Sequence, residues 1–220
     1  MLVAAGVVIL FLVVWTLVGY LPTRGIEKPA HTVIRQASGY EIREYAPRIH
    51  AEVTVAGTYG AALNAGFRKV ADYIFGNNKV GDKVAMTSPV LSKQTGGPGG
   101  NIAMTAPVLH NAGTKAGTHV IAFVMPSEYT MATLPQPTNP EVKLVEVSAE
   151  RYAVLKFRGY ATARRVAKKT AALNRALERD GVEPTGRPVV AQYDPPWTPP
   201  YMRRNEIWCA VRPPEREGTD

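Results

Sequence analysis

An internal repeat restricts the fold of this chain more than any other feature of its sequence. In each half, two strand-like segments precede one amphipathic helix and two further strand-like segments follow it. A sheet that carries one helix per half buries its apolar surface best when the two halves share an interior. The repeat therefore predicts two units that can close their sheets around a shared interior, with one helix against each half.

The two helices of the repeat have clear start and stop signals. Apolar side chains recur at helical spacing within residues 58–75, and Gly76 suits the end of that helix. Thr162 can cap a second helix that runs to about Asp180. The predicted strands cover residues 40–45, 50–55, 119–125, 142–147, 152–160, 189–193 and 206–211.

A shorter repeat lies between the first helix and the strand at 119–125. Residues 83–91 read KVAMTSPVL and residues 101–109 read NIAMTAPVL. The proline in each copy confines its position to a strand end, an edge or a bulge. Met86 and Met104 are expected to point inward as core residues, although a thioether ligand is the alternative.

The N-terminal residues differ in character from the rest of the chain. Residues 2–21 contain no charged side chain and would span about 30 Å as a helix, the thickness of the hydrocarbon core of a bilayer. We expect a retained transmembrane anchor over residues 1–23 and a linker over residues 24–32. A cleaved signal peptide is the alternative, but no basic residue precedes the apolar run.

The charge distribution bears on orientation and partners. Arg24, Lys28 and Arg35 follow the apolar run, so the positive-inside rule predicts a single-pass protein with a cytoplasmic domain, and an extracytoplasmic domain remains the alternative. The net charge of +8 lies entirely after the predicted anchor, where it would be attracted to anionic lipid. The sequence contains no nucleic-acid recognition motif, and no nucleic-acid partner is expected.

Several classes of site are excluded by residue types. The single cysteine, Cys209, rules out an internal disulfide framework and is expected to be buried. The four histidines form no zinc-binding motif, and the chain lacks the glycine-rich nucleotide-binding motifs. No metal site is predicted.

Five separated segments of this chain resemble the SOUL haem-binding protein family. They are YEIREYAPRIHAEV at 40–53, the paired AMTSPV and AMTAPV, FVMPSEY at 123–129, FRGYAT at 157–162 and YDPPWTPPYMRRNEIW at 193–208. The resemblance covers residues 33–211, so we expect one SOUL-like domain over residues 33–212 and a disordered tail over 213–220. It implies an α+β fold related to that of effector-binding domains, a distorted antiparallel β-barrel built from two βαββ repeats with two flanking helices, in agreement with the repeat.

The resemblance also implies that the chain binds haem or another tetrapyrrole between the first helix and the loop before the last strand. Aromatic side chains would stack on the porphyrin, and a cation, Arg203 or Lys69, would pair with a propionate. Arg203 could instead be structural. The implied binding residues are Leu63, Asn64, Phe67, Lys69, Ala71, Trp197, Tyr201, Met202 and Arg203.

Two positions depart from the family pattern. Asn64 stands where some relatives have an arginine, and Glu44 stands where another branch has a histidine proposed as the iron ligand. Since glutamate is a poor substitute for imidazole on haem iron, we expect haem binding without a strong axial ligand. His50 is close in sequence, but strand geometry does not guarantee that it faces the same cavity.

Two functional classes other than tetrapyrrole binding remain open. In each of these three classes the soluble domain is expected to be a monomer. The chain could be a small-molecule hydrolase of the related fold, or a ligand-free interaction module. The hydrolase would use a glutamate with a nearby tyrosine as general base, drawn from Glu44, Glu146, Glu206, Tyr152, Tyr193 and Tyr201.

Overall fold

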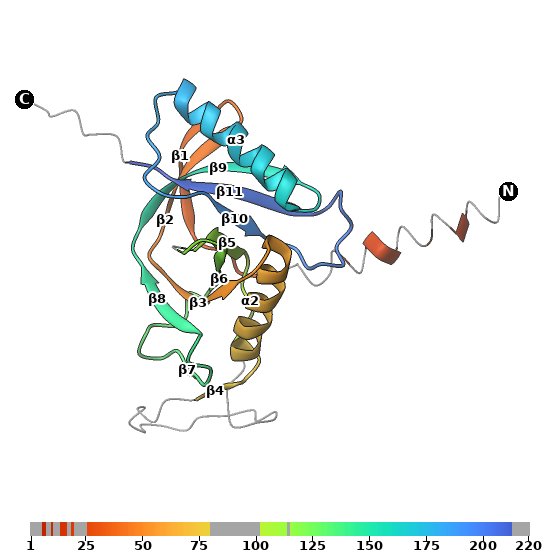
Figure 1. The fold of residues 1–220 in the computed structure, drawn as a ribbon, viewed down its shortest axis with the longest axis vertical. Coiled ribbons are helices and arrows are strands. Elements are labelled where there is room, and N and C mark those ends of the chain that lie inside the picture. The colour runs from red at the N-terminus through yellow and green to blue at the C-terminus, as the bar shows by residue number, and fades with distance from the viewer. Residues whose placement is uncertain are drawn as a thin grey trace, which may run out of the picture.

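The computed structural model describes residues 26–79, 102–113 and 115–212, together with residues 6, 7, 10, 14–16 and 19 of the N-terminal segment. Within these residues the chain forms two long helices, nine strands of one sheet and one two-stranded ribbon (Figure 1). The elements are β1 (His31–Ala37), β2 (Tyr40–Tyr45), β3 (Arg48–Ala56), α2 (Tyr59–Ile74), β4 (Asn78–Lys79), β5 (Val108–Ala112), β6 (Thr118–Val124), β7 (Gln136–Pro137), β8 (Lys143–Val147), β9 (Glu150–Arg158), α3 (Ala163–Arg179), β10 (Val189–Gln192) and β11 (Arg204–Ala210).

The large sheet is antiparallel throughout and has the strand order β1-β2-β9-β11-β10-β5-β6-β3-β8. It curls into an open half-barrel, since β1 and β8 form its two edges and do not pair with each other (Figure 1). The α+β class and the antiparallel sheet are confirmed. The closed barrel is corrected to a half-barrel among the described strands.

The internal repeat is visible in the topology. The units β3-α2-β5-β6 and β9-α3-β10-β11 have the same local strand order, and they join where β5 pairs with β10. The strand that precedes each unit is exchanged, because β2 pairs with β9 of the second half and β8 pairs with β3 of the first. Each unit thus pairs with the strand that precedes the other unit in the chain.

Both predicted helices are confirmed, with their ends at the predicted signals. α2 begins after Thr58 and ends before Phe75, and Gly76 adopts a left-handed φ of 112°. In α3 the Thr162 hydroxyl accepts a hydrogen bond from the amide of Arg165 at 3.3 Å, which satisfies one of the free donors of the first turn.

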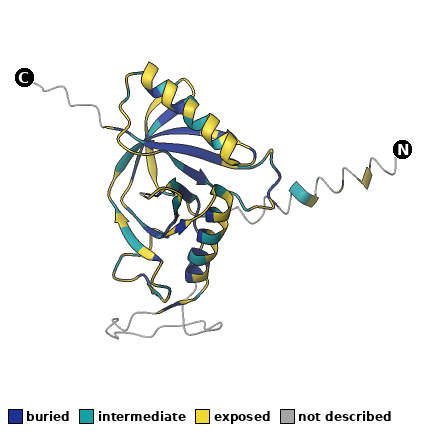
Figure 2. Ribbon diagram, viewed as in Figure 1, coloured by how far each residue is buried: buried dark blue, intermediate teal, exposed yellow. Residues whose placement is uncertain are grey.

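The helices cover the same face of the sheet, each over its own half (Figure 2). α2 packs on β3 and β6, where Val53, Ile121 and Phe123 are buried. α3 packs on β9 and β11 with Leu173 and Leu177 inward. Most half-buried residues lie outside the helices and the four strands beneath them, on the other seven strands and in the loops (Figure 2).

The MTAP segment differs from its prediction. Residues 102–107 form no strand, so they do not alternate inward and outward, and Met104 is 40% exposed rather than in the core. Ile102 and Thr105 are buried instead, and the Thr105 hydroxyl donates to the carbonyl of Val124. Pro107 precedes β5 and removes no ladder hydrogen bond, as predicted. The MTSP copy, with Met86, lies outside the described residues.

Most of residues 1–25 and all of residues 213–220 lie outside the described residues, and so do the anchor and tail predicted there. The helices that the structure describes include none with the length and apolar content needed to cross a bilayer. β1 begins at His31, within the predicted linker.

Candidate functional site

The predicted site corresponds to one region of the helix-covered face. We call it the seam: the part of that face between α2 and the loop of residues 193–203, with β5 and β10 beneath it. The ring of Phe67 on α2 lies 5.3 Å from that of Phe123 on β6. Phe123 pairs with Val108 on β5, and Val108 pairs with Gln192, the last residue of β10. The loop therefore begins two strands from Phe67, about 10 Å across the sheet.

The predicted residues of α2 lie on two different flanks. Phe67 and Lys69 project about 200° apart around the helix axis. The ammonium Nζ of Lys69 pairs with Glu141 Oε2 at 2.8 Å, and Glu141 lies just before the edge strand β8. Phe67 and its neighbours Asn64 and Ala71 therefore face the seam, while Lys69 does not share it. Phe67 is 36% exposed, Ala71 is buried, and Leu63 is half-buried against the core.

The loop of residues 193–203 presents two large aromatic side chains. Trp197 is 53% exposed and Tyr201 is 54% exposed. The guanidinium of Arg203 fixes the loop, because Nε donates to the carbonyl of Thr198 at 2.9 Å and Nη2 donates to the carbonyl of Pro196. Its Nη1 makes no hydrogen bond to a described residue. The structural role foreseen for Arg203 is confirmed, and Met202 beside it is half-buried.

Buried polar atoms without partners gather around the seam. Buried polar groups in folded proteins are almost always hydrogen-bonded, and exceptions often mark the position of a ligand or a water. Those that find no partner among the described residues and lie on this face are Gln192 Nε2, Thr198 Oγ1, His110 Nδ1 and Tyr59 Oη. The seam thus has hydrogen-bonding capacity that the protein itself does not use.

His110, on β5, is one end of a short histidine relay. The carbonyl of Gly57 can only accept, so His119 Nε2 carries the hydrogen of their 3.1 Å contact and neutral His119 accepts at Nδ1. His110 Nε2 must then donate to His119 Nδ1 at 2.9 Å, which leaves His110 Nδ1 as a bare lone pair. Burial, with a smaller effect of His119, lowers the pKa of His110 to about 4. Tyr59 stacks on this ring at 4.4 Å and encloses it.

Glu44 and His50, the two positions considered as ligands of haem iron, lie elsewhere in the sheet. Glu44 is on β2, separated from β10 by β9 and β11, and its carboxylate pairs with Arg151 at 3.0 Å. His50 points to the face opposite α2, where burial, with a smaller effect of Arg48, lowers its pKa to about 3. Neither side chain can meet a ligand bound in the seam.

The carboxylate of Glu206 is the centre of a buried polar network on the sheet face opposite the helices. It accepts two hydrogen bonds from Arg43 at 3.0 and 3.1 Å, one from Tyr193 Oη at 2.6 Å and one from Trp208 Nε1 at 2.7 Å. Burial raises the pKa of Tyr193 above its usual value. Because four donors, two of them from a guanidinium, already hold this carboxylate, Glu206 is poorly placed to act as a general base.

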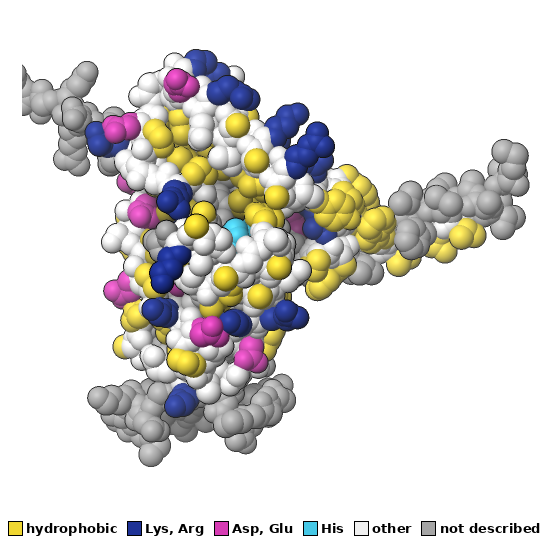
Figure 3. All heavy atoms as spheres, viewed as in Figure 1, with side chains coloured by type: hydrophobic (Ala, Val, Ile, Leu, Met, Phe, Trp, Pro, Cys, Tyr) yellow, Lys and Arg dark blue, Asp and Glu magenta, His cyan; other side chains and the backbone are white. Residues whose placement is uncertain are grey.

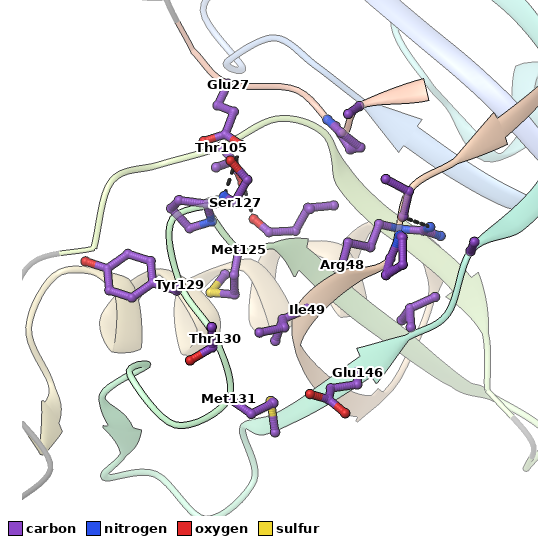
Figure 4. Close-up of a pocket in the computed structure, with 18 of the residues that line it drawn as sticks. Glu27, Arg48, Ile49, Thr105, Met125, Ser127, Tyr129, Thr130, Met131 and Glu146 are labelled. Carbon is purple, nitrogen blue, oxygen red and sulfur yellow. Dashed lines mark hydrogen bonds between the residues drawn. The ribbon is translucent and has the colours of Figure 1, made fainter. Parts of the chain in front are cut away.

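A cavity of about 550 Å³ lies away from the seam, beside the loop of residues 126–131 (Figure 4). Its lining contains none of the nine predicted binding residues. Ser127 closes one side by donating its amide hydrogen to Glu27 Oε1 at 3.0 Å. Side chains that line it include Arg48, Ile49, Met125, Met131, Glu27 and Glu146.

The curled antiparallel sheet with one helix per half defines an α+β half-barrel protein. The chain is similar in fold to the C-terminal domain of EcmrR, with a TM-score of 0.55 and 12% identity over 79% of this chain and 98% of that one. It is also similar to an uncharacterised conserved protein from Listeria innocua, with a TM-score of 0.50 and 12% identity over 86% of this chain and 94% of that one.

Within this fold the sequence identifies the family. The chain belongs to the SOUL heme-binding protein family, whose model matches residues 26–210. It is also similar to heme-binding protein 2 of Homo sapiens, with 27% identity over 175 residues that make up 79% of this chain and 78% of the human protein. The resemblance found in the sequence is confirmed.

Proposed function

We propose that this chain binds haem or a related tetrapyrrole non-covalently in the seam, and so buffers or transports it. The observation that carries the proposal is the pairing of exposed aromatic surface with unused buried polar atoms at one place. Phe67, Trp197 and Tyr201 offer flat apolar surface, while Gln192 and Thr198 keep unpartnered polar atoms beside it. Membership of a heme-binding family and the similarity to heme-binding protein 2 support the choice of ligand.

The side chains at the seam suit such a ligand. Stacking on aromatic side chains would supply most of the affinity, since apolar burial stabilises by roughly 25 cal/mol per Å². Arg203 could direct its unused Nη1 toward a propionate, and the exposed amide of Asn64 could donate a hydrogen bond. Lys69 is held by Glu141 on the far flank and is left out of the proposed site.

Haem would bring an iron centre with one or two open coordination positions, and no described residue offers it a strong ligand. Glu44 and His50 lie elsewhere in the sheet, and His110 Nδ1 is enclosed. Bound haem should then be five-coordinate or weakly ligated. Iron-free porphyrin should bind nearly as tightly, because aromatic contacts and hydrogen bonds do not require the metal.

We further propose that residues 1–23 anchor the chain in a membrane, with the domain as a monomer on the cytoplasmic side. The support is the uncharged run of residues 2–21 and the basic residues that follow it. Tetrapyrroles partition into bilayers because their macrocycle is apolar. A tethered domain would therefore meet them at the membrane surface.

The test is a titration of the full chain in detergent with haem and with protoporphyrin IX, followed by the Soret band. We expect one molecule bound per chain, with affinities for the two ligands within about tenfold of each other. Phe67→Ala and Trp197→Ala should each weaken binding by roughly tenfold or more, given the usual value of an aromatic contact. Phe75→Ala is the matched control, since Phe75 is a 60% exposed aromatic residue at the other end of α2.

Unchanged affinity in both seam variants would remove the seam as the site. A thousandfold preference for haem over protoporphyrin IX would instead reveal an iron ligand and refute the weakly ligated state. Absence of a Soret shift at stoichiometric protein would favour the interaction module over a tetrapyrrole carrier.

A further inference from the structure

The outer face of α3 carries a stripe of positive charge along its whole length. We call Arg164, Lys168, Arg175 and Arg179 the basic stripe. At 100° per residue these four side chains project within an arc of about 60°, opposite the buried Leu173 and Leu177. From first to last residue the stripe is about 22 Å long.

The stripe is not neutralised within the described part of the chain. Arg164, Lys168 and Arg175 form no ion pair there, whereas Arg179 pairs with Asp180 at the helix end and donates to the carbonyl of Ser38 at 3.3 Å. α3 contains six basic residues and one acidic residue, Glu178. Figure 3 shows lysine and arginine side chains gathered over this helix. Like charges at this spacing repel each other, so the arrangement favours an anionic partner.

The loop of residues 193–203 adjoins the start of α3. The guanidinium of Arg203 lies 4.3 Å from the ring centre of Tyr160, which precedes α3 by three residues. Arg158, at the end of β9, donates to the carbonyl of Tyr201 at 3.1 Å. The exposed rings of Trp197 and Tyr201 therefore lie next to the N-terminal end of the basic stripe.

The apolar N-terminal segment reaches the same loop. Trp15 Nε1 donates to the carbonyl of Trp197 at 2.9 Å, and the hydroxyls of Thr16 and Tyr201 are 2.5 Å apart. Figure 3 shows hydrophobic side chains beside this junction and basic side chains of α3 adjacent to them on the same side of the molecule. Trp15, Thr16, the aromatic loop and the basic stripe thus lie on one continuous face.

We propose that this face binds the surface of an anionic phospholipid membrane. The basic stripe would lie along the headgroups, whose negative charge it complements, and Trp197 and Tyr201 would enter the interfacial layer that tryptophan and tyrosine favour. A nucleic acid would match the charge alone, whereas the adjoining aromatic rings and apolar segment match a bilayer. This assignment does not depend on tetrapyrrole binding.

The experiment uses the full chain with vesicles of phosphatidylcholine alone or mixed with phosphatidylglycerol, both containing an energy-acceptor lipid. A donor dye is attached at Ala171→Cys, an exposed position beside the basic stripe that carries no charge. Ala132→Cys is the matched control, an exposed alanine in the loop that precedes β7. The native Cys209 is buried and does not compete for the dye.

We expect energy transfer from position 171 to rise about twofold or more when phosphatidylglycerol is added, and to fall again in high salt because the charges are screened. Transfer from position 132 should not respond. Replacing the four stripe residues by glutamine should abolish the response at 171 while leaving the melting temperature unchanged.

Equal transfer from position 171 in both kinds of vesicle, or failure of the chain to associate with phosphatidylglycerol vesicles at low salt, would overturn the proposal. So would a quadruple glutamine variant that keeps its lipid response but loses affinity for duplex DNA, since the stripe would then serve a nucleic acid.

Discussion

His110 illustrates how a single residue can depend on a neighbour that the sequence does not place beside it. Its tautomer is fixed by His119 and, through His119, by the carbonyl of Gly57. The contact exists because β5 and β6 pair with Ala112 opposite His119, and no spacing rule connects these residues. Burial lowers the pKa of His110 and favours its neutral imidazole, which suits a buried position next to apolar side chains.

The buried histidines predict a specific pH dependence of stability. The folded-state pKa values of His110 and His50, about 4 and about 3, lie below the usual value of about 6.5 in an unfolded chain. Above that value neither state binds a proton and stability is at its full level. As pH falls from about 6.5 toward 4, the unfolded chain takes up protons that the folded chain excludes.

The free energy of unfolding should therefore fall by roughly 2 kcal/mol between about pH 6 and pH 5. Denaturant titrations at a series of pH values measure it. A double variant, His50→Gln with His110→Gln, should be less stable at neutral pH but should lose most of this slope. The interpretation fails if the wild-type stability is flat over this interval.

At the residue scale, the sequence predicts which side chains share a helix flank but not which partners they meet. Phe67, Asn64 and Ala71, implied by the family resemblance, lie on one flank of α2 as helical spacing requires. Lys69 could not be excluded, since its ion pair with Glu141 joins residues far apart in the chain. The unpartnered side chains of Gln192 and Thr198 depend on surroundings that no sequence pattern reveals.

At the scale of elements, α2 depends on a close approach to the sheet. A Cβ added to Gly66 would lie 2.4 Å from Cγ1 and 2.7 Å from Cβ of Ile121 on β6. Glycine at this position lets the helix backbone approach β6 closely enough to bury Val70 and Ile74. This contact sets the distance between the sheet and the side of α2 that faces the seam.

Gly66→Ala should destabilise the protein by about 1–3 kcal/mol, since a β-branched side chain on a central strand cannot move away freely. Gly60→Ala in the first turn of the same helix is the control, because nothing lies within 4 Å of the added carbon. That change should stabilise by up to about 1 kcal/mol through helix propensity. Thermal melts of the two variants that shift in the same direction would contradict this account of α2.

The elements that the sequence predicted are those with strong periodicity or clear caps, and the missed ones lack both. α2, α3 and β2 lie where their patterns placed them. β5 was not predicted as a separate strand because Val108–Ala112 is short and begins directly after residues 102–107, which form no strand. β1 was missed because its edge position leaves it almost wholly exposed, without an alternating pattern.

At the scale of the whole molecule, the exchange of β2 and β8 ties the two halves together. If the halves were separated, β2 would lose its partner β9 and β8 would lose its partner β3, so the described domain should unfold as one cooperative unit. The sequence predicted the repeat but not this exchange, because strand pairing between distant segments follows from the shared interior and not from local pattern.

Removal of residues 1–23 tests the independence of this domain. The truncated chain should be a soluble monomer with a single cooperative melting transition, and it should no longer sediment with membranes after an alkaline wash. Its core clusters lie within residues 40–211, which should be enough to fold. An insoluble product, or one that resists the wash without detergent, would mean that the anchor is assigned wrongly.

The measurement that tests the central claim most directly is the location of bound protoporphyrin IX by NMR. The ring current of the macrocycle shifts nearby amide resonances, and the iron-free ligand avoids paramagnetic broadening. With the full chain in a lipid nanodisc, we expect the largest shifts at Asn64, Phe67 and Ala71 of α2 and within residues 193–203. Shifts centred on Arg48, Met125 and Glu146 would place the ligand in the 550 Å³ cavity and contradict the seam.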